Sequence, residues 1–302
     1  MLKNIVYFGS AQFTADIFEA LFEAKIVNIV AVVTTPDRPV GRKQIVTPSP
    51  LALSAERYNL PVYKPEKLDE ANLAHLRLLK PDLFLVVAYG QYFTESWLKT
   101  PNLATLNIHF SLLPKYRGSL CISETLKNGD EETGVTLMEM ASKLDAGDII
   151  AQQKVKIDLD DNCETLNQKL TESAKQILLH DFAVYLDGGL EAVPQDKTLV
   201  TVTPSFKTKT RQNAFVSYED LLDAMHGKNA LTVHNFIRSQ NPDPGAWTIV
   251  SNSKSVIPAK AGIHPINSTE LKLLKTTTKN DKLVIESVQV PGKNPIPWAQ
   301  FS

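Results

Sequence analysis

The chain has 302 residues, of which 43% are hydrophobic and 22% are charged, and its formal net charge is −1. This composition is typical of a globular protein with one large domain, or with a large and a small one. No run approaches the roughly 18 apolar residues that span a bilayer, and the first ten residues lack the pattern of a secretory signal. Cys121 and Cys163 are too few for a disulfide scaffold and have no metal-binding spacing with a histidine. We therefore expect a soluble cytoplasmic protein with reduced thiols, no membrane contact and no bound metal.

The charges are unevenly distributed along the chain. Residues 1–200 contain 20 basic and 26 acidic residues, whereas residues 201–302 contain 12 and 7. A basic C-terminal third favours an anionic partner there, although a solvated surface with a chance imbalance explains the same counts.

The first ninety residues alternate between apolar strands and amphipathic helices. Residues 4–9 form a short apolar run closed by glycine, which is typical of a buried strand. The same patterns predict a strand within 28–37 that stops at a Thr–Pro turn, further strands at 61–65 and 82–90, and helices at 13–24, 49–60 and 69–80. Strands without polar alternation, separated by helices, indicate an α/β fold with a mostly parallel sheet covered on both faces. Ligands of such sheets lie at the carboxyl ends of the strands, here at Gly9, Thr34, Tyr89–Gly90 and Asn107–His109.

The rest of the chain changes character twice. Residues 121–129 predict a helix, 134–140 and 148–157 predict strands, and 161–186 predict one long helix with Asp161 and Glu164 as a capping box. Residues 200–216 are polar and rich in Thr and Lys, which is typical of a linker. A small β-rich domain follows, with a helix at 230–240 and strands near 247–250, 271–278 and 282–290. Residues 251–269 show no alternation typical of a strand and predict an inserted flexible loop.

The strand–glycine–helix start raises the possibility of a dinucleotide site. The turn after the first strand has a single glycine, Gly9, where the dinucleotide-binding fingerprint requires three. A dinucleotide cofactor is therefore not expected.

Asn107 and His109 form the centre of the candidate site. Residues i and i+2 of an extended segment share a face, so both side chains project from the strand end into one crevice. The amide is a neutral donor suited to a developing oxyanion, and the imidazole can exchange a proton near neutral pH. Asp145, in the loop at 141–147, is the candidate carboxylate that orients the imidazole. No Ser or Cys stands on a sharp elbow beside them, so the set favours direct acyl transfer.

Each of these residues also has a structural interpretation. A single histidine beside a strand is often a structural hydrogen-bonding group, and Asn107 could cap the turn. Asp145 is an ordinary turn residue, and Asp148 is an alternative partner for the imidazole. The spacing alone leaves these alternatives open.

Two segments resemble a known family. Residues 107–118, NIHFSLLPKYRG, resemble the N-x-H-x-S-L-L-P signature of the formyltetrahydrofolate-dependent formyltransferases, and ETGVTLMEMASKLDAGDII resembles that family's companion aspartate segment. The resemblance extends over about residues 3–250 and 281–301. It implies a Rossmann-like formyltransferase domain at 1–199, the linker at 200–216, and an OB-like tRNA-binding domain at 217–302. This second domain looks trimmed, because only two strands are expected after residue 269.

The resemblance also implies an activity and its participants. The chain would transfer a formyl group from 10-formyltetrahydrofolate to the α-amino group of charged initiator methionyl-tRNA, and would act as a monomer. Asn107 would hold the formyl oxygen, His109 would donate to it and handle protons, and Asp145 would orient His109. The folate would contact residues at the ends of two strands, namely Val87, Tyr89, Gly90, Ser111, Leu112, Leu113 and Pro114.

Basic residues supply the expected contacts to tRNA. The resemblance places Arg38, Arg42 and Lys43 in a loop that enters the acceptor stem, and a flexible basic loop gains from phosphate contact. Solvation of a proline-rich loop is the alternative interpretation. Lys272, Lys275, Lys279 and Lys282 are further candidates, although exposed lysines on a β surface are ordinary.

The sequence departs from the family after YRG, where Ser119, Leu120 and Cys121 replace a small-small-proline pattern and could reshape the acceptor pocket. Two other functions stay open. One is formylation of an amino-sugar nucleotide, and the other is a folate- or tRNA-binding module with a decayed site.

Overall fold

The structure is a computed structural model that describes residues 1–41, 43–251 and 268–301. The chain forms two compact units, each discontinuous in sequence. The first unit comprises residues 1–117, 134–155 and 168–202, and the second comprises residues 118–133, 156–167 and 203–302.

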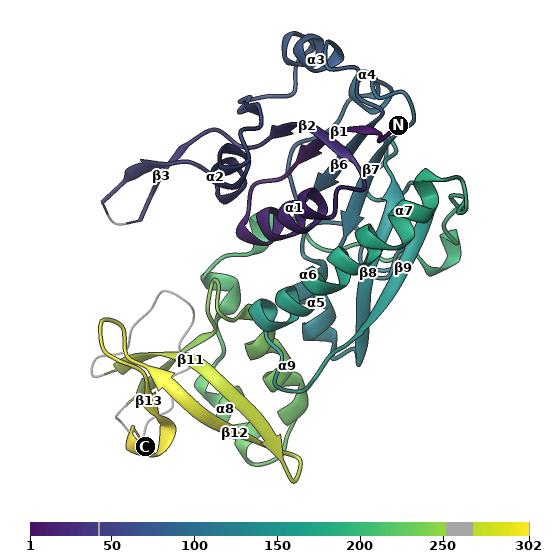
Figure 1. Ribbon diagram of the computed structural model, residues 1–302. Coiled ribbons are helices and arrows are strands. Elements are labelled where there is room, and N and C mark those ends of the chain that lie inside the picture. The colour runs from purple at the N-terminus through teal and green to yellow at the C-terminus, as the bar shows by residue number, and fades with distance from the viewer. Residues whose placement is uncertain (42, 252–267, 302) are drawn as a thin grey trace. The chain divides into compact units, whose positions relative to one another are not determined.

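A seven-stranded sheet forms the centre of the first unit, with the strand order β5-β2-β1-β6-β7-β8-β9 (Figure 1). The pairs from β5 to β7 are parallel, and β8 runs antiparallel to β7. The prediction of a Rossmann-like, mostly parallel sheet is therefore confirmed. The strands are β1 Asn4–Phe8, β2 Asn28–Val33, β5 Val62–Tyr63, β6 Leu83–Val87, β7 Ala104–His109, β8 Glu132–Glu139 and β9 Ile149–Lys156.

Burial explains why these segments are strands. All five residues of β6 are buried, as expected for a strand covered on both faces. Phe8 on β1 contacts the rings of Phe84, Phe93 and Trp97 edge-to-face, an arrangement that stabilises beyond the buried area alone. The helices that follow the strands are α1 Gln12–Ala24, α2 Pro50–Arg57, α3 Glu70–Arg77 and α4 Glu95–Leu98.

The long helix predicted at 161–186 is two helices, α6 Cys163–Leu179 and α7 Asp181–Leu186. Its predicted capping box is also displaced by one residue. The Asn162 side chain accepts from the backbone N–H groups of Glu164 and Thr165, and the Asn162 N–H donates to the Thr165 hydroxyl. The Asp161 carboxylate instead accepts from the backbone of Asp158. The prediction was wrong because adjacent Asp and Asn are both good N-caps, so composition could not select the register.

The segment after β2, predicted as a flexible loop, contains a β-hairpin. Its antiparallel strands are β3 Arg38–Val40 and β4 Ile45–Thr47, and it extends from the body of the first unit in Figure 1. All six strand residues are exposed, so the sequence has no alternation of apolar and polar residues that would predict the hairpin.

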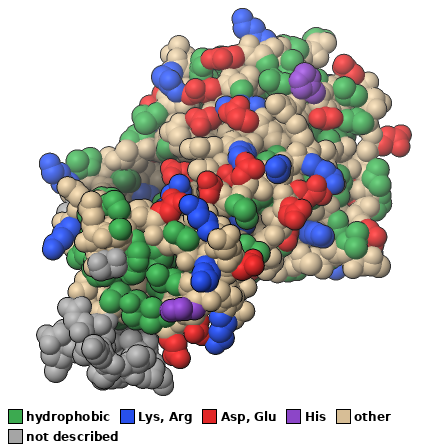
Figure 2. Space-filling view, turned by 90° about the horizontal axis from the view of Figure 1, so that it is seen from below, with side chains coloured by type: hydrophobic (Ala, Val, Ile, Leu, Met, Phe, Trp, Pro, Cys, Tyr) green, Lys and Arg blue, Asp and Glu red, His purple; other side chains and the backbone are tan. Residues whose placement is uncertain are grey.

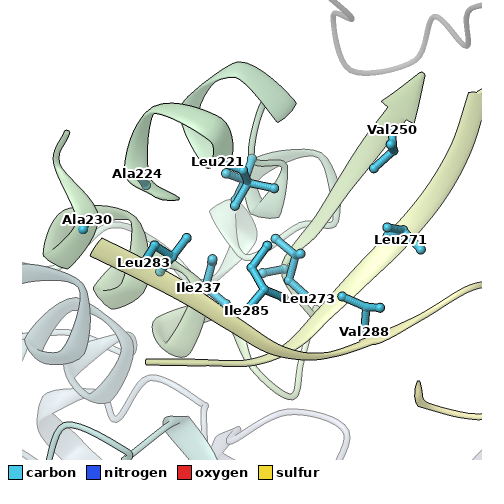
Figure 3. Packing of buried hydrophobic residues seen from close by; sticks show 12 residues of the cluster. Leu221, Ala224, Ala230, Ile237, Val250, Leu271, Leu273, Leu283, Ile285 and Val288 are labelled. Atoms are coloured by element: carbon cyan, nitrogen blue, oxygen red, sulfur yellow. The ribbon is translucent and has the colours of Figure 1, made fainter. Parts of the chain in front are cut away.

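The second unit packs helices against a four-stranded antiparallel sheet. Its apolar cluster joins residues of both, and Figure 3 shows Leu221 and Ile237 among the side chains that meet those of the sheet. The helices are α5 Cys121–Asn128, α8 Tyr218–Met225 and α9 Ala230–Gln240, and the strands are β10 Trp247–Ser251, β11 Ser268–Lys279, β12 Lys282–Gln289 and β13 Ile296–Pro297.

Two predictions for this region need correction. β10 and β11 extend into the predicted loop, pairing as far as Ser251 with Ser268, whereas residues 252–267 lie outside the described part. β13 adds a short third strand where two were expected after residue 269. The predicted linker at 200–216 contains short 3-10 turns, at Phe206–Thr208 and Gln212–Ala214, and a further turn precedes it at Lys197–Leu199.

Candidate active site

Asn107 and His109 lie on the same face of β7, near its carboxyl end. β7 pairs with β6 on one side and β8 on the other, so neighbouring backbone fixes both flanks. His109 is 7% exposed, whereas Asn107 is half-buried and its side chain makes no hydrogen bond to any described residue. A half-buried amide without a protein partner is available to a bound oxygen atom.

The two ring nitrogens of His109 face different partners. Nε2 lies 3.0 Å from the carbonyl oxygen of Tyr116, and Nδ1 lies 3.8 Å from Oδ2 of Asp145. A carbonyl oxygen can only accept, so Nε2 carries a proton in this geometry. Nδ1 instead faces the Asp145 carboxylate.

Asp145 reaches His109 because of the loop between β8 and β9. Its backbone is left-handed, with φ of 48°, a conformation that Asp tolerates better than most residues. Gly147 follows two residues later, and a Cβ there would overlap the Glu139 carbonyl oxygen. The loop is thus pressed against the end of β8. Asp148, the alternative partner, accepts the Glu139 N–H at its backbone carbonyl, 2.9 Å away, and within the described part of the chain its carboxylate forms no ion pair with the imidazole.

The loop after β7 is fixed by hydrogen bonds within itself and to side chains of β8 and β9. Ser111 and Leu113 are buried, and the Ser111 hydroxyl donates to the Lys115 carbonyl at 2.7 Å. Thr136 donates to the Ser111 carbonyl, and Gln152 donates to the Leu113 carbonyl. Leu112 and Pro114 are only half-buried. Of the four residues of this loop that were expected to contact folate, these two are the more accessible, and the other two shape the loop.

The end of β6 lies beside the end of β7, where Val86 pairs with Asn107. Val87 and Tyr89 are buried, and burial raises the pKa of Tyr89 to about 12. Gly90 is exposed, with φ of 82°. This geometry leaves backbone, rather than the Val87 or Tyr89 side chains, to face a ligand at this strand end.

The basic residues expected at tRNA lie on the hairpin. Arg38 is exposed and forms an ion pair with Glu66 at 2.5 Å, and Lys43 is exposed without an ion-pair partner among the described residues. Arg42 lies outside the described residues. In the second unit, Lys275 is paired with Glu286 at 3.0 Å. On the face shown in Figure 2, acidic and basic side chains are interspersed.

Four residues in this region were missed by the sequence analysis: Thr136, Gln152, Arg117 and Gln195. Thr136 and Gln152 hold the loop after β7 from the neighbouring strands. Gln195 contacts Arg117 and the backbone of the Asp145 loop. Residues 117 and 195 are 78 positions apart, and no local pattern connects them.

Among the described residues, no helix has the length and apolar character to cross a bilayer. Across the same part of the chain, no three or more His, Cys, Asp or Glu side chains gather in a way that could hold a metal ion.

Comparison with known proteins agrees with the geometry. A family model described as formyl transferase matches residues 3–181, and one described as formyl transferase, C-terminal domain, matches residues 226–302. The methionyl-tRNA formyltransferase of Staphylococcus epidermidis is 35% identical over 97% of this chain and 93% of its own length. That of Lactobacillus acidophilus is 38% identical over 84% of this chain and 77% of its own length.

Solved structures show the same fold at lower identity. A 4-N formyltransferase from Francisella tularensis has a TM-score of 0.63 and 16% identity, covering 87% of this chain and 99% of its own. WlaRD, a sugar 3N-formyl transferase, has a TM-score of 0.59 and 17% identity, covering 97% and 99%. Because the family model covers more than half of the chain and the curated relatives match nearly all of it, the chain belongs to the formyl transferase family.

Proposed function

We propose that this protein transfers the formyl group of 10-formyltetrahydrofolate to the α-amino group of charged initiator methionyl-tRNA. The observation that carries the proposal is the placement of Asn107 and His109 near the end of β7, with the Asp145 carboxylate 3.8 Å from the His109 ring. The near full-length identity to methionyl-tRNA formyltransferases selects the acceptor. We place this activity in the cytoplasm and expect the enzyme to act as a monomer.

The residues present fit the formyl donor. Asn107 offers a half-buried amide without a partner among the described residues, and Gly90 exposes backbone at the adjacent strand end. Leu112 and Pro114 offer partly exposed apolar surface. When bound, the donor supplies a formyl group on nitrogen, which is already an activated acyl group.

Each side chain has a separate task in the transfer. The Asn107 amide donates to the formyl oxygen, which gains negative charge as the amine attacks the carbonyl carbon. His109, whose Nε2 proton is held by the Tyr116 carbonyl, accepts the proton of the attacking amine at Nδ1. Asp145 stabilises the resulting imidazolium by its charge. The protonated ring then donates to the nitrogen that leaves as the carbon–nitrogen bond breaks, which returns the ring to its neutral form.

The neutral amine is a competent nucleophile without a metal. An α-amino group has a reference pKa of about 7.7–8.0, so an appreciable fraction is neutral near pH 7. The transfer therefore needs charge stabilisation and a proton acceptor, and the three side chains supply both.

The experiment is transfer of labelled formyl from 10-formyltetrahydrofolate to charged initiator tRNA, with an amino-sugar nucleotide as the competing acceptor. Labelled formyl-methionyl-tRNA is the expected product. Formylation of the nucleotide sugar alone would establish the alternative activity. Folate or tRNA binding without turnover on either acceptor would indicate a binding module instead.

A further inference from the structure

Gln195 joins the loop that carries Asp145 to the loop that follows His109. Its Nε2 donates to the carbonyl oxygens of Asp145 and Gly147, at 2.9 and 2.7 Å. Its Oε1 accepts from Nε and Nη2 of Arg117, at 3.1 and 2.7 Å. The side chain is 8% exposed. We infer that Gln195 is a positioning residue that holds the Asp145 carboxylate at His109.

The first half of the argument concerns the Asp145 loop. Gln195 holds two carbonyl groups that lie on either side of Ala146, while the Ala146 N–H donates back to the Lys143 carbonyl. The direction of the Asp145 side chain depends on its left-handed backbone, which is costly to maintain in a free loop. Two donated hydrogen bonds at this turn select that conformation.

The second half concerns the loop after β7. The Arg117 N–H donates to the Thr201 carbonyl, and the Tyr116 N–H donates to the Thr201 hydroxyl. The Tyr116 carbonyl in turn accepts from His109 Nε2. Through Arg117, Gln195 is therefore connected to Tyr116, whose carbonyl contacts Nε2 of His109. Through the Asp145 backbone it is connected to the carboxylate beside Nδ1.

The inference rests on the proposed function, because a positioned carboxylate matters only if His109 exchanges a proton during transfer. Misplacing a catalytic group by about 1 Å can cost about 100-fold in rate. Glutamine suits this place because the site needs two donated protons on one side and an acceptor on the other. Glutamate has the same shape but places a carboxylate oxygen against two carbonyls, while its contact to Arg117 becomes an ion pair.

The test is Gln195→Glu, measured alone and combined with Asp145→Asn. We expect kcat for formyl transfer to fall about 10- to 100-fold, with KM for folate and charged tRNA changed less than about threefold. In the Asp145→Asn background, Gln195→Glu should lower kcat by no more than about twofold. A residue that acts through the Asp145 carboxylate has no further effect on kcat once that carboxylate is gone. Gln153→Glu is the matched control, because in the part of the chain that the structure describes the side-chain amide of Gln153, on β9, has the Gln176 side chain as its hydrogen-bond partner, far from His109 in sequence and on no catalytic loop.

Three results would overturn the inference. The first is a wild-type kcat in Gln195→Glu when Asp145→Asn is impaired. The second is an equal loss of kcat when Gln195→Glu is introduced into the wild type and into Asp145→Asn. The third is a lower thermal midpoint in Gln195→Glu with no change in kcat. Unimpaired turnover in Asp145→Asn itself would instead refute the proposed mechanism. If Gln195→Glu does not fold, Gln195→Met keeps the length without donor or acceptor and is judged by the same criteria.

Discussion

At the scale of the residue, the structure separates two aspartates that the sequence left equivalent. Asp145 lies 3.8 Å from His109 Nδ1, with its side chain 11% exposed. Asp148 is three positions later in the same loop. Only the first has a carboxylate beside the imidazole, so chemistry and loop structure can be separated by parallel substitutions.

Asp145→Asn should lower kcat about 100- to 10,000-fold, the range typical of a lost acid–base contribution. Asparagine tolerates a left-handed backbone at least as well as aspartate, so the loop is expected to keep its shape. Asp148→Asn is the control, and its kcat should stay within about threefold of the wild type. The measurement is single-turnover formyl transfer. Equal losses in the two variants would show that loop structure, rather than the Asp145 charge, sets the rate.

At the scale of the element, two glycines test what holds this loop in place. Gly147 has no left-handed backbone, but an added Cβ would overlap the Glu139 carbonyl oxygen. Gly188 has φ of 78° and open space around its Cα. The first position therefore excludes alanine by contact alone, and the second disfavours it by backbone conformation alone.

Gly147→Ala should reduce both stability and kcat, because the loop must leave the end of β8 and take Asp145 with it. We expect a loss of about 1–3 kcal/mol in unfolding free energy, as for an overpacked site, and at least about a 10-fold loss of kcat. Gly188→Ala should cost about 1 kcal/mol and leave kcat unchanged. Denaturant unfolding and formyl transfer on the same preparations provide the measurements. Normal kcat in Gly147→Ala would show that the Asp145 loop does not need this contact.

The hairpin β3–β4 has a different role to test. Lys43 is exposed and has no ion-pair partner among the described residues. It can therefore bind a phosphate group without first breaking an ion pair within the protein. Lys43→Ala should raise KM for charged tRNA about three- to tenfold and reduce the salt dependence of binding by about one unit of slope. Folate binding should be unaffected. Lys99→Ala removes an exposed cation paired with Glu95 on α4 and should change neither quantity. Equal losses for the two lysines would exclude a specific hairpin contact.

The elements that the sequence predicted are those whose burial leaves a pattern. β1, β2 and β6 are continuous apolar runs, and α1 buries one stripe, so each matched its prediction. The hairpin β3–β4 was missed because exposed strands of three residues show no alternation between inside and outside. The division at His180 was missed because the apolar spacing of α6 continues into α7 across a single residue, whose backbone stays in the right-handed region with φ of −111° and ψ of −70°.

The candidate site divides in a similar way. Asn107 and His109 could be predicted because they are two positions apart on one strand, and strand geometry places them together. Asp145 required family resemblance, since strand geometry alone also allowed Asp148. Gln195 could not be predicted, because its contacts depend on the tertiary approach of segments 50 and 78 positions away.

At the scale of the whole molecule, the second unit is not the C-terminal segment alone. The family model for the C-terminal domain matches residues 226–302, whereas the compact unit also includes residues 118–133 and 156–167. Two side chains of α9 bind the second of these segments. His234 Nε2 donates to the Leu159 carbonyl, and Arg238 Nη1 donates to the carbonyls of Asp158 and Asp161. The integrity of the unit thus depends on polar contacts between distant parts of the chain.

These contacts make the stability of the second unit depend on pH. His234 is 2% exposed, donates from Nε2 and accepts from the Thr276 hydroxyl at Nδ1, which is the pattern of a neutral ring. Burial lowers the pKa of His234, and the charge of Arg238 acts in the same direction. The Leu159 hydrogen bond and the carboxylates of Asp160 and Glu286 oppose this shift without reversing it.

The unfolded chain therefore binds a proton at His234 more readily than the folded protein does. The resulting stability is fully present above the ordinary histidine pKa of about 6.5 and is lost as pH falls below it. His234→Gln keeps a donor and an acceptor but does not titrate, so its unfolding free energy should fall less between pH 7 and pH 5, by about 1 kcal/mol. His226→Gln removes an exposed histidine at the end of α8 and should follow the wild type. Denaturant unfolding is followed by tryptophan fluorescence in a shared Trp97→Phe background, because Trp97 lies in the first unit whereas Trp247 and Trp298 lie in the second. An equally steep fall in His234→Gln would assign the pH dependence to other groups.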